Sequence, residues 1–205
     1  MTVSLVAAMC VVMTSCLKND NSSYVPPVDP AVEAPVLQHF IDSTGFNMVY
    51  SQDSLFTYDA GASGYVKVGG KFPYLYYEIV EQGDKSATPV EIDYKELGIN
   101  REGKAKVYGN LSDSTVFVSV TYKGTFLDGK VFDQTKDGQA VWFWLPQTIT
   151  AWRLLIDKVG IGGHIRILSP SIYAYGNAQV QGIPVNSPLF FDIQVKGFLH
   201  NRDFQ

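Results

Sequence analysis

The chain has 205 residues, of which 46% are hydrophobic and 13% aromatic. This length allows one domain of about 100–150 residues with an extension, and the apolar fraction is sufficient for a sizeable core. The formal net charge is −4 and no basic stripe is interleaved with aromatic residues, which argues against a nucleic-acid-binding protein.

The first residues of the chain, 1–17, contain no charged side chain. This stretch is shorter than the roughly 20 residues that span a bilayer as a helix, and it fits the apolar region of a secretory signal peptide. Near its end, Met-Thr-Ser-Cys at 13–16 resembles a bacterial lipobox. The resemblance implies a signal peptide over 1–15 and lipidation of Cys16. Because no Lys or Arg precedes the apolar stretch, a non-cleaved anchor and a buried apolar N-terminus are the alternatives.

The following segment, 16–30, is polar and rich in Asn, Ser and Pro, which predicts a flexible lipidated tether. If residues 1–15 are removed, Cys10 leaves with them and Cys16 carries lipid, so the mature chain has no thiol left for a disulfide. We therefore expect a protein of the bacterial cell envelope that is held at a membrane by its lipid. The expected location is the outer membrane, with the domain facing the periplasm or the cell surface.

A helix is predicted over residues 31–42. Asp29 offers an N-cap and Pro30 a first-turn proline, and Ser-Thr-Gly at 43–45 ends the run. The apolar residues that recur near helical spacing are Val32, Val36, Phe40 and Ile41.

The remainder of an N-terminal extension, 31–110, has few clear signals. Residues 46–57 mix aromatic and polar side chains and are compatible with a strand, and 61–70 are typical of a turn region. Residues 75–80 are rich in β-branched and aromatic side chains, which predicts a strand. Residues 83–109 are polar and turn-rich, and no element is assigned to them.

The last part of the chain, 111–205, alternates as strands do. Asp128-Gly129 is a strong hairpin signal, and the strand at 142–144 ends at Pro146. Period two also predicts strands at 164–167 and 189–197. The residues that alternation places on one face of the strand at 115–122 are Val116, Val118, Val120 and Tyr122.

One short helix is predicted between these strands, and the glycines at 160–163 end it. A short helix packed against several antiparallel strands is an α+β arrangement. The apolar stripe of this helix consists of Trp152, Leu155, Ile156 and Val159.

Short motifs in residues 111–205 together resemble the FKBP family of peptidyl-prolyl isomerases. The resemblance implies a curved antiparallel sheet wrapped around one short helix, and cis-trans isomerase activity on X-Pro bonds. In chain order the motifs are Tyr122-Lys123-Gly124, Asp128-Gly129, Phe132-Asp133, Phe143 with Leu145, Ile149 with Trp152, Ala174-Tyr175-Gly176, and Ile183-Pro184 followed by Leu189-Phe190-Phe191.

The resemblance also implies roles for individual residues. Tyr175 would hold the substrate carbonyl, Trp152 would form the floor beneath the proline ring, and Asp133 would complete the catalytic set at the rim. No metal and no cofactor is expected, because the three histidines lack metal-ligand spacing. The substrate-binding wall would consist of Tyr122, Phe132, Phe143, Ile149, Ile183 and Phe191.

Some positions near this site depart from the family pattern. Thr148 stands where valine is common, Ala151 replaces a glycine before the tryptophan, and Val185 replaces a second proline. Three functions therefore remain open. The first is an isomerase whose partners are proline-containing unfolded or exported polypeptides. The second is a chaperone or binding module of the same fold with little activity. The third is a structural or ligand-binding partner in an outer-membrane assembly that makes its contacts through 31–110.

Overall fold

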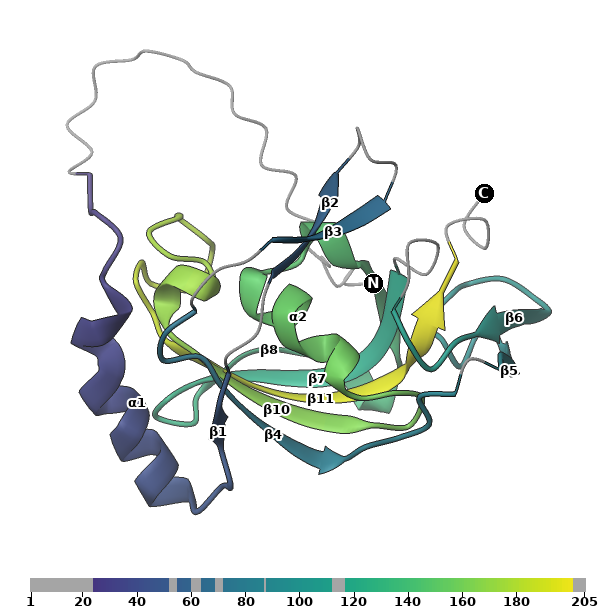
Figure 1. The fold of residues 1–205 in the computed structure, drawn as a ribbon, viewed down its shortest axis with the longest axis horizontal. Coiled ribbons are helices and arrows are strands. Elements are labelled where there is room, and N and C mark those ends of the chain that lie inside the picture. Colours follow the sequence, from purple (N-terminus) through teal and green to yellow (C-terminus); the bar gives the residue numbers. More distant parts are fainter. Residues whose placement is uncertain are drawn as a thin grey trace, which may run out of the picture.

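A computed structural model of the chain describes residues 24–51, 72–86, 88–111 and 117–200, together with the backbone of the strands at 55–59 and 64–68 (Figure 1). The expected signal peptide and Cys16 lie outside these residues. Within the described parts, no helix combines the length and apolarity needed to cross a membrane.

The centre of the molecule is a curved seven-stranded sheet (Figure 1). Its order is β1-β4-β10-β11-β7-β8, with β9 also paired to β7, and the pairings are antiparallel. The strands predicted at 75–80, 142–144, 164–167 and 189–197 are confirmed. Their bounds are β1 Val49–Tyr50, β4 Tyr76–Glu81, β7 Phe117–Phe126, β8 Val131–Gln134, β9 Val141–Trp144, β10 His164–Ser169 and β11 Leu189–Leu199.

A short helix, α2 (Thr150–Leu155), lies in the concave face of this sheet and continues as a 3-10 turn over Ile156–Lys158 (Figure 1). The α-helical part is shorter than the predicted stripe, because the chain tightens into the 3-10 turn after Leu155. The whole stripe is nevertheless buried. The predicted α+β fold, a curved antiparallel sheet around one short helix, is confirmed.

A second helix, α1 (Pro30–Thr44), lies against the outer face of the sheet (Figure 1). The predicted cap is present, since Oδ1 of Asp29 accepts a hydrogen bond from the N–H of Ala31 at 2.9 Å. At the other end Gly45 has a φ of +66°, the left-handed conformation that glycine adopts without strain. The helix therefore runs slightly beyond the predicted 31–42 at both ends.

The face that α1 buries matches the expected one only in part, since Phe40 is buried and Ile41 packs against the same core as predicted. Val32 and Val36 are 71% and 51% exposed, whereas Leu37 and Phe40 are buried against Leu168 of β10 and Phe190 of β11. Each residue turns a helix by about 100°, so the residue after Val32, which is Glu33, falls in line with Leu37 and Phe40. The stripe at positions 33, 37 and 40 faces the sheet.

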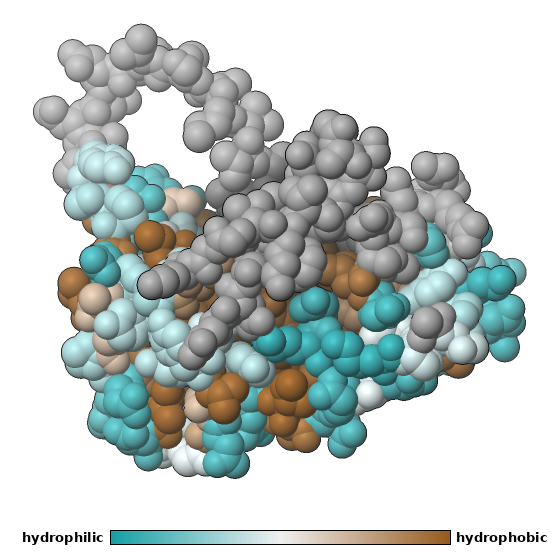
Figure 2. Space-filling view, viewed as in Figure 1, coloured by the Kyte–Doolittle hydropathy of each residue, from teal (hydrophilic) through white to brown (hydrophobic). Residues whose placement is uncertain are grey.

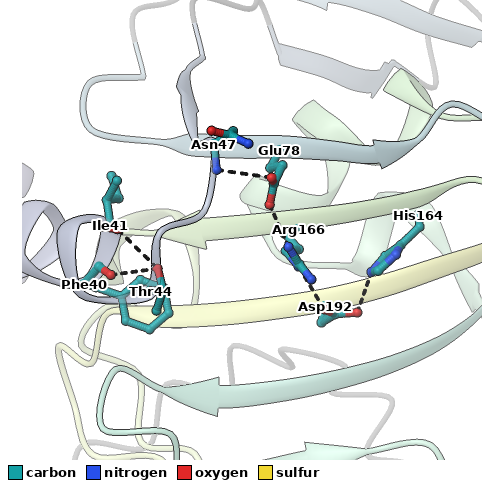
Figure 3. A network of polar contacts seen from close by, with 8 residues as sticks. All are labelled: Phe40, Ile41, Thr44, Asn47, Glu78, His164, Arg166 and Asp192. Atoms are coloured by element: carbon teal, nitrogen blue, oxygen red, sulfur yellow. Dashed lines mark hydrogen bonds and ion pairs between the residues drawn. The ribbon is translucent and has the colours of Figure 1, made fainter.

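A polar network joins the outer face of the sheet to the chain that leaves α1 (Figure 3). Arg166 donates hydrogen bonds to Glu78 at 2.9 Å and to Asp192 at 3.2 Å. Asp192 also contacts His164 at 2.7 Å, and Glu78 accepts a bond from the backbone N–H of Asn47 at 3.1 Å. These contacts connect β4, β10 and β11 side by side.

Two hairpins complete the fold. The region 83–109, which the sequence left unassigned, contains β5 (Val90–Asp93) and β6 (Lys104–Val107). The hairpin of β2 (Leu55–Asp59) and β3 (Gly64–Val68) lies over α2 (Figure 1). The expected single strand at 46–57 is therefore wrong, because it divides into β1 and β2. The expected turn at 61–70 contains β3, whose β-branched and aromatic residues outweigh the nearby glycines.

The surface is uneven in polarity. Figure 2 shows hydrophilic residues gathered over the β5–β6 end. On the side of α1 and β4, apolar residues are exposed among the polar ones. The exposed apolar side chains of those two elements are Val32, Val36, Ile79 and Val80.

Candidate active site

Aromatic side chains from several elements meet around the indole of Trp152 on α2. The ring centroid of Trp152 lies 5.4 Å from that of Tyr122, 5.3 Å from Phe143 and 5.7 Å from Phe191. The interplanar angles of 82°, 85° and 82° are edge-to-face, the arrangement that aromatic quadrupoles favour. Phe132 adds a further ring, 5.7 Å from Phe191. We call these five side chains the aromatic cluster.

Strand alternation brings Tyr122 to this cluster. Val118 and Val120 are fully buried in the core on the α2 side of β7, and Tyr122 packs against the same core, as predicted. The next residue on this face is Gly124. A Cβ there would lie 2.5 Å from Cζ of Phe132, so the absence of a side chain lets that ring rest on the strand.

The indole of Trp152 is held tightly and is 4% exposed. Its backbone N–H donates to the carbonyl of Ile149 at 3.1 Å, in the first turn of α2. Its ring nitrogen Nε1 is buried and has no hydrogen-bond partner among the described residues. A buried donor without a partner is costly, so this N–H is available to a ligand that brings an acceptor.

Tyr122 and Asp133 form the polar rim of the cluster. The Tyr122 hydroxyl donates a hydrogen bond to Oδ2 of Asp133, which is an exposed carboxylate on β8. Burial raises the pKa of Tyr122, and the hydrogen bond and charge of Asp133 raise it further. The Tyr122 phenol is therefore protonated at neutral pH and keeps its hydrogen bond to the Asp133 carboxylate.

Tyr175 is the second phenol at the rim, on the loop after β10. Its side chain is half-buried and packs against the core that contains Trp152. Burial raises the pKa of Tyr175, and the charge of Asp133 adds to the effect, so the two groups lie within electrostatic reach. In the described parts of the chain, no residue forms a hydrogen bond with the Tyr175 hydroxyl, which leaves it free to donate.

The structure thus brings the predicted site residues together. Ile149, Ile183 and Tyr175 pack with the aromatic cluster in one hydrophobic core, and Asp133 joins it through Tyr122. The sequence analysis missed Phe126, whose ring lies 5.5 Å from Phe132. The signal was present, because Phe126 follows Tyr122 and Gly124 on the same face of β7.

Two surface hollows lie beside β7 and at the β5–β6 hairpin, and Tyr122 of the aromatic cluster is among the residues that line the first. One of about 330 Å³ lies beside β7 and is lined by polar residues such as Thr121 and Gln194. The other, of about 380 Å³, is lined by charged residues of the β5–β6 hairpin, including Asp93 and Arg101. Neither offers the apolar surface that the aromatic cluster has. The described residues also contain no group of three or more His, Cys, Asp or Glu arranged to hold a metal ion.

Comparison with known proteins connects this geometry to a family. The family model described as FKBP-type peptidyl-prolyl cis-trans isomerase matches residues 109–196. FK506-binding protein 4 of Aspergillus fumigatus is 38% identical over 115 residues, which is 55% of this chain and 22% of that protein. The isomerase FkpA of Escherichia coli (strain K12) is 36% identical over 109 residues, which is 49% of this chain and 40% of that protein.

The fold agrees with these sequence matches. The crystal structure of FkpA from Escherichia coli superimposes with a TM-score of 0.51 at 25% identity, covering 83% of this chain and 61% of that one. The chain spans less than half the length of the two curated relatives named above. Residues 109–196, which carry the aromatic cluster, Tyr175 and Asp133, are a domain of the FKBP-type peptidyl-prolyl cis-trans isomerase family, a class of enzymes.

Proposed function

We propose that this protein catalyses cis-trans isomerisation of X-Pro bonds in exported or envelope polypeptides. The observation that carries the proposal is the aromatic cluster around Trp152, with the hydroxyl of Tyr175, which has no hydrogen-bond partner among the described residues, at its rim. The proline ring would lie on the indole of Trp152. Tyr175 would donate to the carbonyl before the proline, and the bond from Tyr122 to Asp133 would fix the opposite rim.

The chemistry requires no nucleophile. Rotation about X-Pro is slow because resonance gives the amide partial double-bond character. At the transition state the amide is twisted and less dipolar than the planar ground state. An apolar aromatic surface therefore disfavours the planar form more than the twisted one. A fixed donor such as Tyr175, aligned with the twisted carbonyl, adds the differential binding that lowers a barrier.

The required effect is modest. Uncatalysed isomerisation takes tens of seconds, so a turnover near 10 per second needs an acceleration of roughly 100- to 1,000-fold. That corresponds to about 3–4 kcal/mol. One hydrogen bond contributes about 1 kcal/mol net, and each aromatic contact about 0.5–1.5 kcal/mol. Contacts with Trp152, Phe132, Phe191 and Tyr175 are of sufficient size to the extent that they are stronger with the twisted amide than with the planar one.

The envelope location belongs to this proposal because of residues 1–30. Their sequence, an apolar stretch that ends in Met-Thr-Ser-Cys and a polar segment after it, supports a lipid anchor at Cys16 and a tether to the domain. A domain held this way would meet polypeptides that arrive unfolded after export, when X-Pro bonds are still a mixture of isomers. Such polypeptides are the proposed substrates and partners.

A binding or chaperone module with little activity is the second candidate. The exposed fraction of Trp152 is 4%, so the indole must become accessible before a proline ring can lie on it. Ala151 is fully buried beside it where the family pattern has glycine, and Thr148 bonds to the carbonyl of Leu145 at 2.7 Å. These contacts favour a tightly closed site.

One paired assay separates the two candidates. The exchange rate of a proline tetrapeptide is measured with the purified protein, and the aggregation of an unfolded client is measured in the same buffer. The isomerase proposal predicts a rate that rises linearly with protein concentration. A rate equal to that of buffer, together with slower client aggregation, would select the binding module instead.

A further inference from the structure

A buried carboxylate on α1 lies outside the family-matched residues. Glu33 is 6% exposed, on the face of α1 that packs on the sheet. Its Oε2 accepts a hydrogen bond from the backbone N–H of Ser171 at 2.7 Å, although 138 residues separate the two in sequence. Its other oxygen, Oε1, is buried without a hydrogen-bond partner among the described residues. Among the described residues the Glu33 carboxylate therefore accepts one hydrogen bond, and its donor belongs to the loop after β10.

Ser171 lies at the start of the loop that carries Tyr175, and both its backbone N–H and its carbonyl form hydrogen bonds. The carbonyl of Ser171 accepts two hydrogen bonds, from the N–H of Ala174 at 2.9 Å and from the N–H of Gly176 at 2.8 Å. These two residues flank Tyr175 on either side. Ser171 therefore connects the two: its N–H is bound by Glu33, and its carbonyl fixes the backbone on both sides of Tyr175.

The chain before α1 holds the other side of this loop. Asn177 donates through its side chain to the carbonyl of Val25, and Asn186 donates to the carbonyl of Pro26, both at 2.9 Å. The backbone N–H of Asn186 also bonds to the carbonyl of Gly176 at 2.7 Å. The stretch from Val25 to Glu33 thus contacts both ends of the Tyr175 loop.

Packing alone does not account for a glutamate at this position. Leu37 and Phe40 already attach α1 to Leu168 and Phe190. An apolar residue one turn earlier would continue that contact, whereas an ionised carboxylate is costly to bury unless it forms hydrogen bonds. Glu33 supplies an acceptor for the N–H of Ser171, and an apolar residue cannot do so.

We infer that Glu33 is a positioning residue for Tyr175, so that the N-terminal extension helps to build the active site. This inference rests on the proposed function, because it takes Tyr175 as the group that holds the substrate carbonyl. Loss of the acceptor frees the Ser171 peptide, and the phenol then samples orientations that miss the carbonyl. Small displacements of an aligned group reduce the rate of a chemical step strongly.

The test compares Glu33→Leu, Glu33→Gln and Asp42→Ala with the wild-type protein. Leucine keeps the packing and removes the acceptor, and glutamine keeps an acceptor oxygen. Asp42→Ala is the control, because it removes an exposed carboxylate of the same helix whose partner is Gln38. Three quantities are measured: hydrogen exchange at the Ser171 amide, urea stability, and kcat and KM for a proline tetrapeptide.

Glu33→Leu is expected to fold, to exchange the Ser171 amide faster, and to lower kcat by up to about fivefold, the loss expected when the Tyr175 hydroxyl is removed, with a smaller change in KM. Its urea midpoint should fall slightly, because the buried N–H of Ser171 loses its acceptor. Glu33→Gln is expected to recover most of kcat and of the amide protection, and Asp42→Ala to match wild type in all three. If Glu33 served only to pack α1 on the sheet, Glu33→Leu would keep the full activity of the wild-type protein. Wild-type kcat in Glu33→Leu, or unchanged exchange at Ser171, would overturn the inference alone. An inactive wild-type protein would overturn the proposed function and this inference together.

Discussion

Tyr122 on β7 and Asp133 on β8 are joined by a hydrogen bond from phenol to carboxylate across adjacent strands of the hairpin. Because of this bond, the hydroxyl groups of Tyr122 and Tyr175 differ in their hydrogen bonding. Tyr122 is committed to Asp133, whereas the hydroxyl of Tyr175 has no partner in the described parts of the chain and can donate to a substrate. Burial raises the pKa of both phenols, and the Asp133 carboxylate raises it further. Both phenols are therefore protonated donors at neutral pH.

The raised pKa of Tyr122 predicts a loss of stability in alkali. Below about pH 10 the phenol is protonated in both the folded and the unfolded chain, so its contribution is fully present. Above that pH the unfolded phenol ionises while the folded one keeps its proton, and the free energy of unfolding falls as pH rises. Urea unfolding from about pH 8 to about pH 11 should show this fall, and Tyr122→Phe should make it shallower. Tyr24→Phe, at a 77% exposed ring, is the control, and equal slopes in wild type and Tyr122→Phe would contradict the account.

Trp152→Phe should impair both stability and activity. The smaller ring leaves space against Tyr122 and Phe191, which should lower the free energy of unfolding by about 1–3 kcal/mol. It also removes the proposed floor for the proline ring, so kcat/KM should fall at least about tenfold, equivalent to about 1.4 kcal/mol. Trp142→Phe is the matched control, because that indole is 38% exposed on β9. Equal losses of activity in the two variants would mean that Trp152 has no special part in catalysis.

Gly124→Ala tests the close approach of Phe132 to β7. The added Cβ would lie 2.5 Å from Cζ of the ring, so Phe132 must shift from its present position against β7 and beside Phe191. Overpacking of this kind should cost about 1–3 kcal/mol of stability. In the double variant Gly124→Ala with Phe132→Leu, the clash is relieved, and the two effects should be clearly non-additive in urea unfolding. Additive effects would show that the two residues do not contact each other in this way.

Cys16→Ser tests the proposed lipid anchor. In cells fed a labelled fatty acid, the wild-type protein should be labelled and should sediment with membranes. Cys16→Ser should abolish the label and leave unprocessed precursor. Cys10→Ser is the control, since that residue lies within the segment proposed to be removed. Label that persists in Cys16→Ser would refute lipidation at this position.

The C-terminal part of the fold was predictable from local signals. Period-two alternation placed Val118, Val120 and Tyr122 on one face, and Asp128-Gly129 fixed the hairpin, where Gly129 has a φ of +87°. Each motif lies within a few residues of sequence, so no knowledge of distant contacts was needed. The site residues could be named for the same reason, since each lies in such a motif.

The N-terminal part depends on contacts that no local pattern reveals. Val32 and Val36 suggested the buried face of α1, yet the sheet selects the face with Glu33 because Leu168 and Phe190 supply an apolar partner there. Likewise, the hairpin at 90–107 is stabilised by distant partners, such as the bond from Ser119 Oγ to the carbonyl of Leu97 at 2.8 Å. Tertiary packing decides these elements, and local propensity is only a weak guide to it.

The most direct test of the central claim is the rate of cis-trans exchange in a proline tetrapeptide with wild-type protein, Tyr175→Phe and Tyr173→Phe. The account predicts catalysis by wild type, a kcat/KM lower by about fivefold in Tyr175→Phe because one hydrogen bond of about 1 kcal/mol is lost, and wild-type activity in Tyr173→Phe. Tyr173 is a suitable control because it lies on the same loop and its ring packs on Phe72. No catalysis by the wild-type protein, or equal activity in wild type and Tyr175→Phe, would contradict the account.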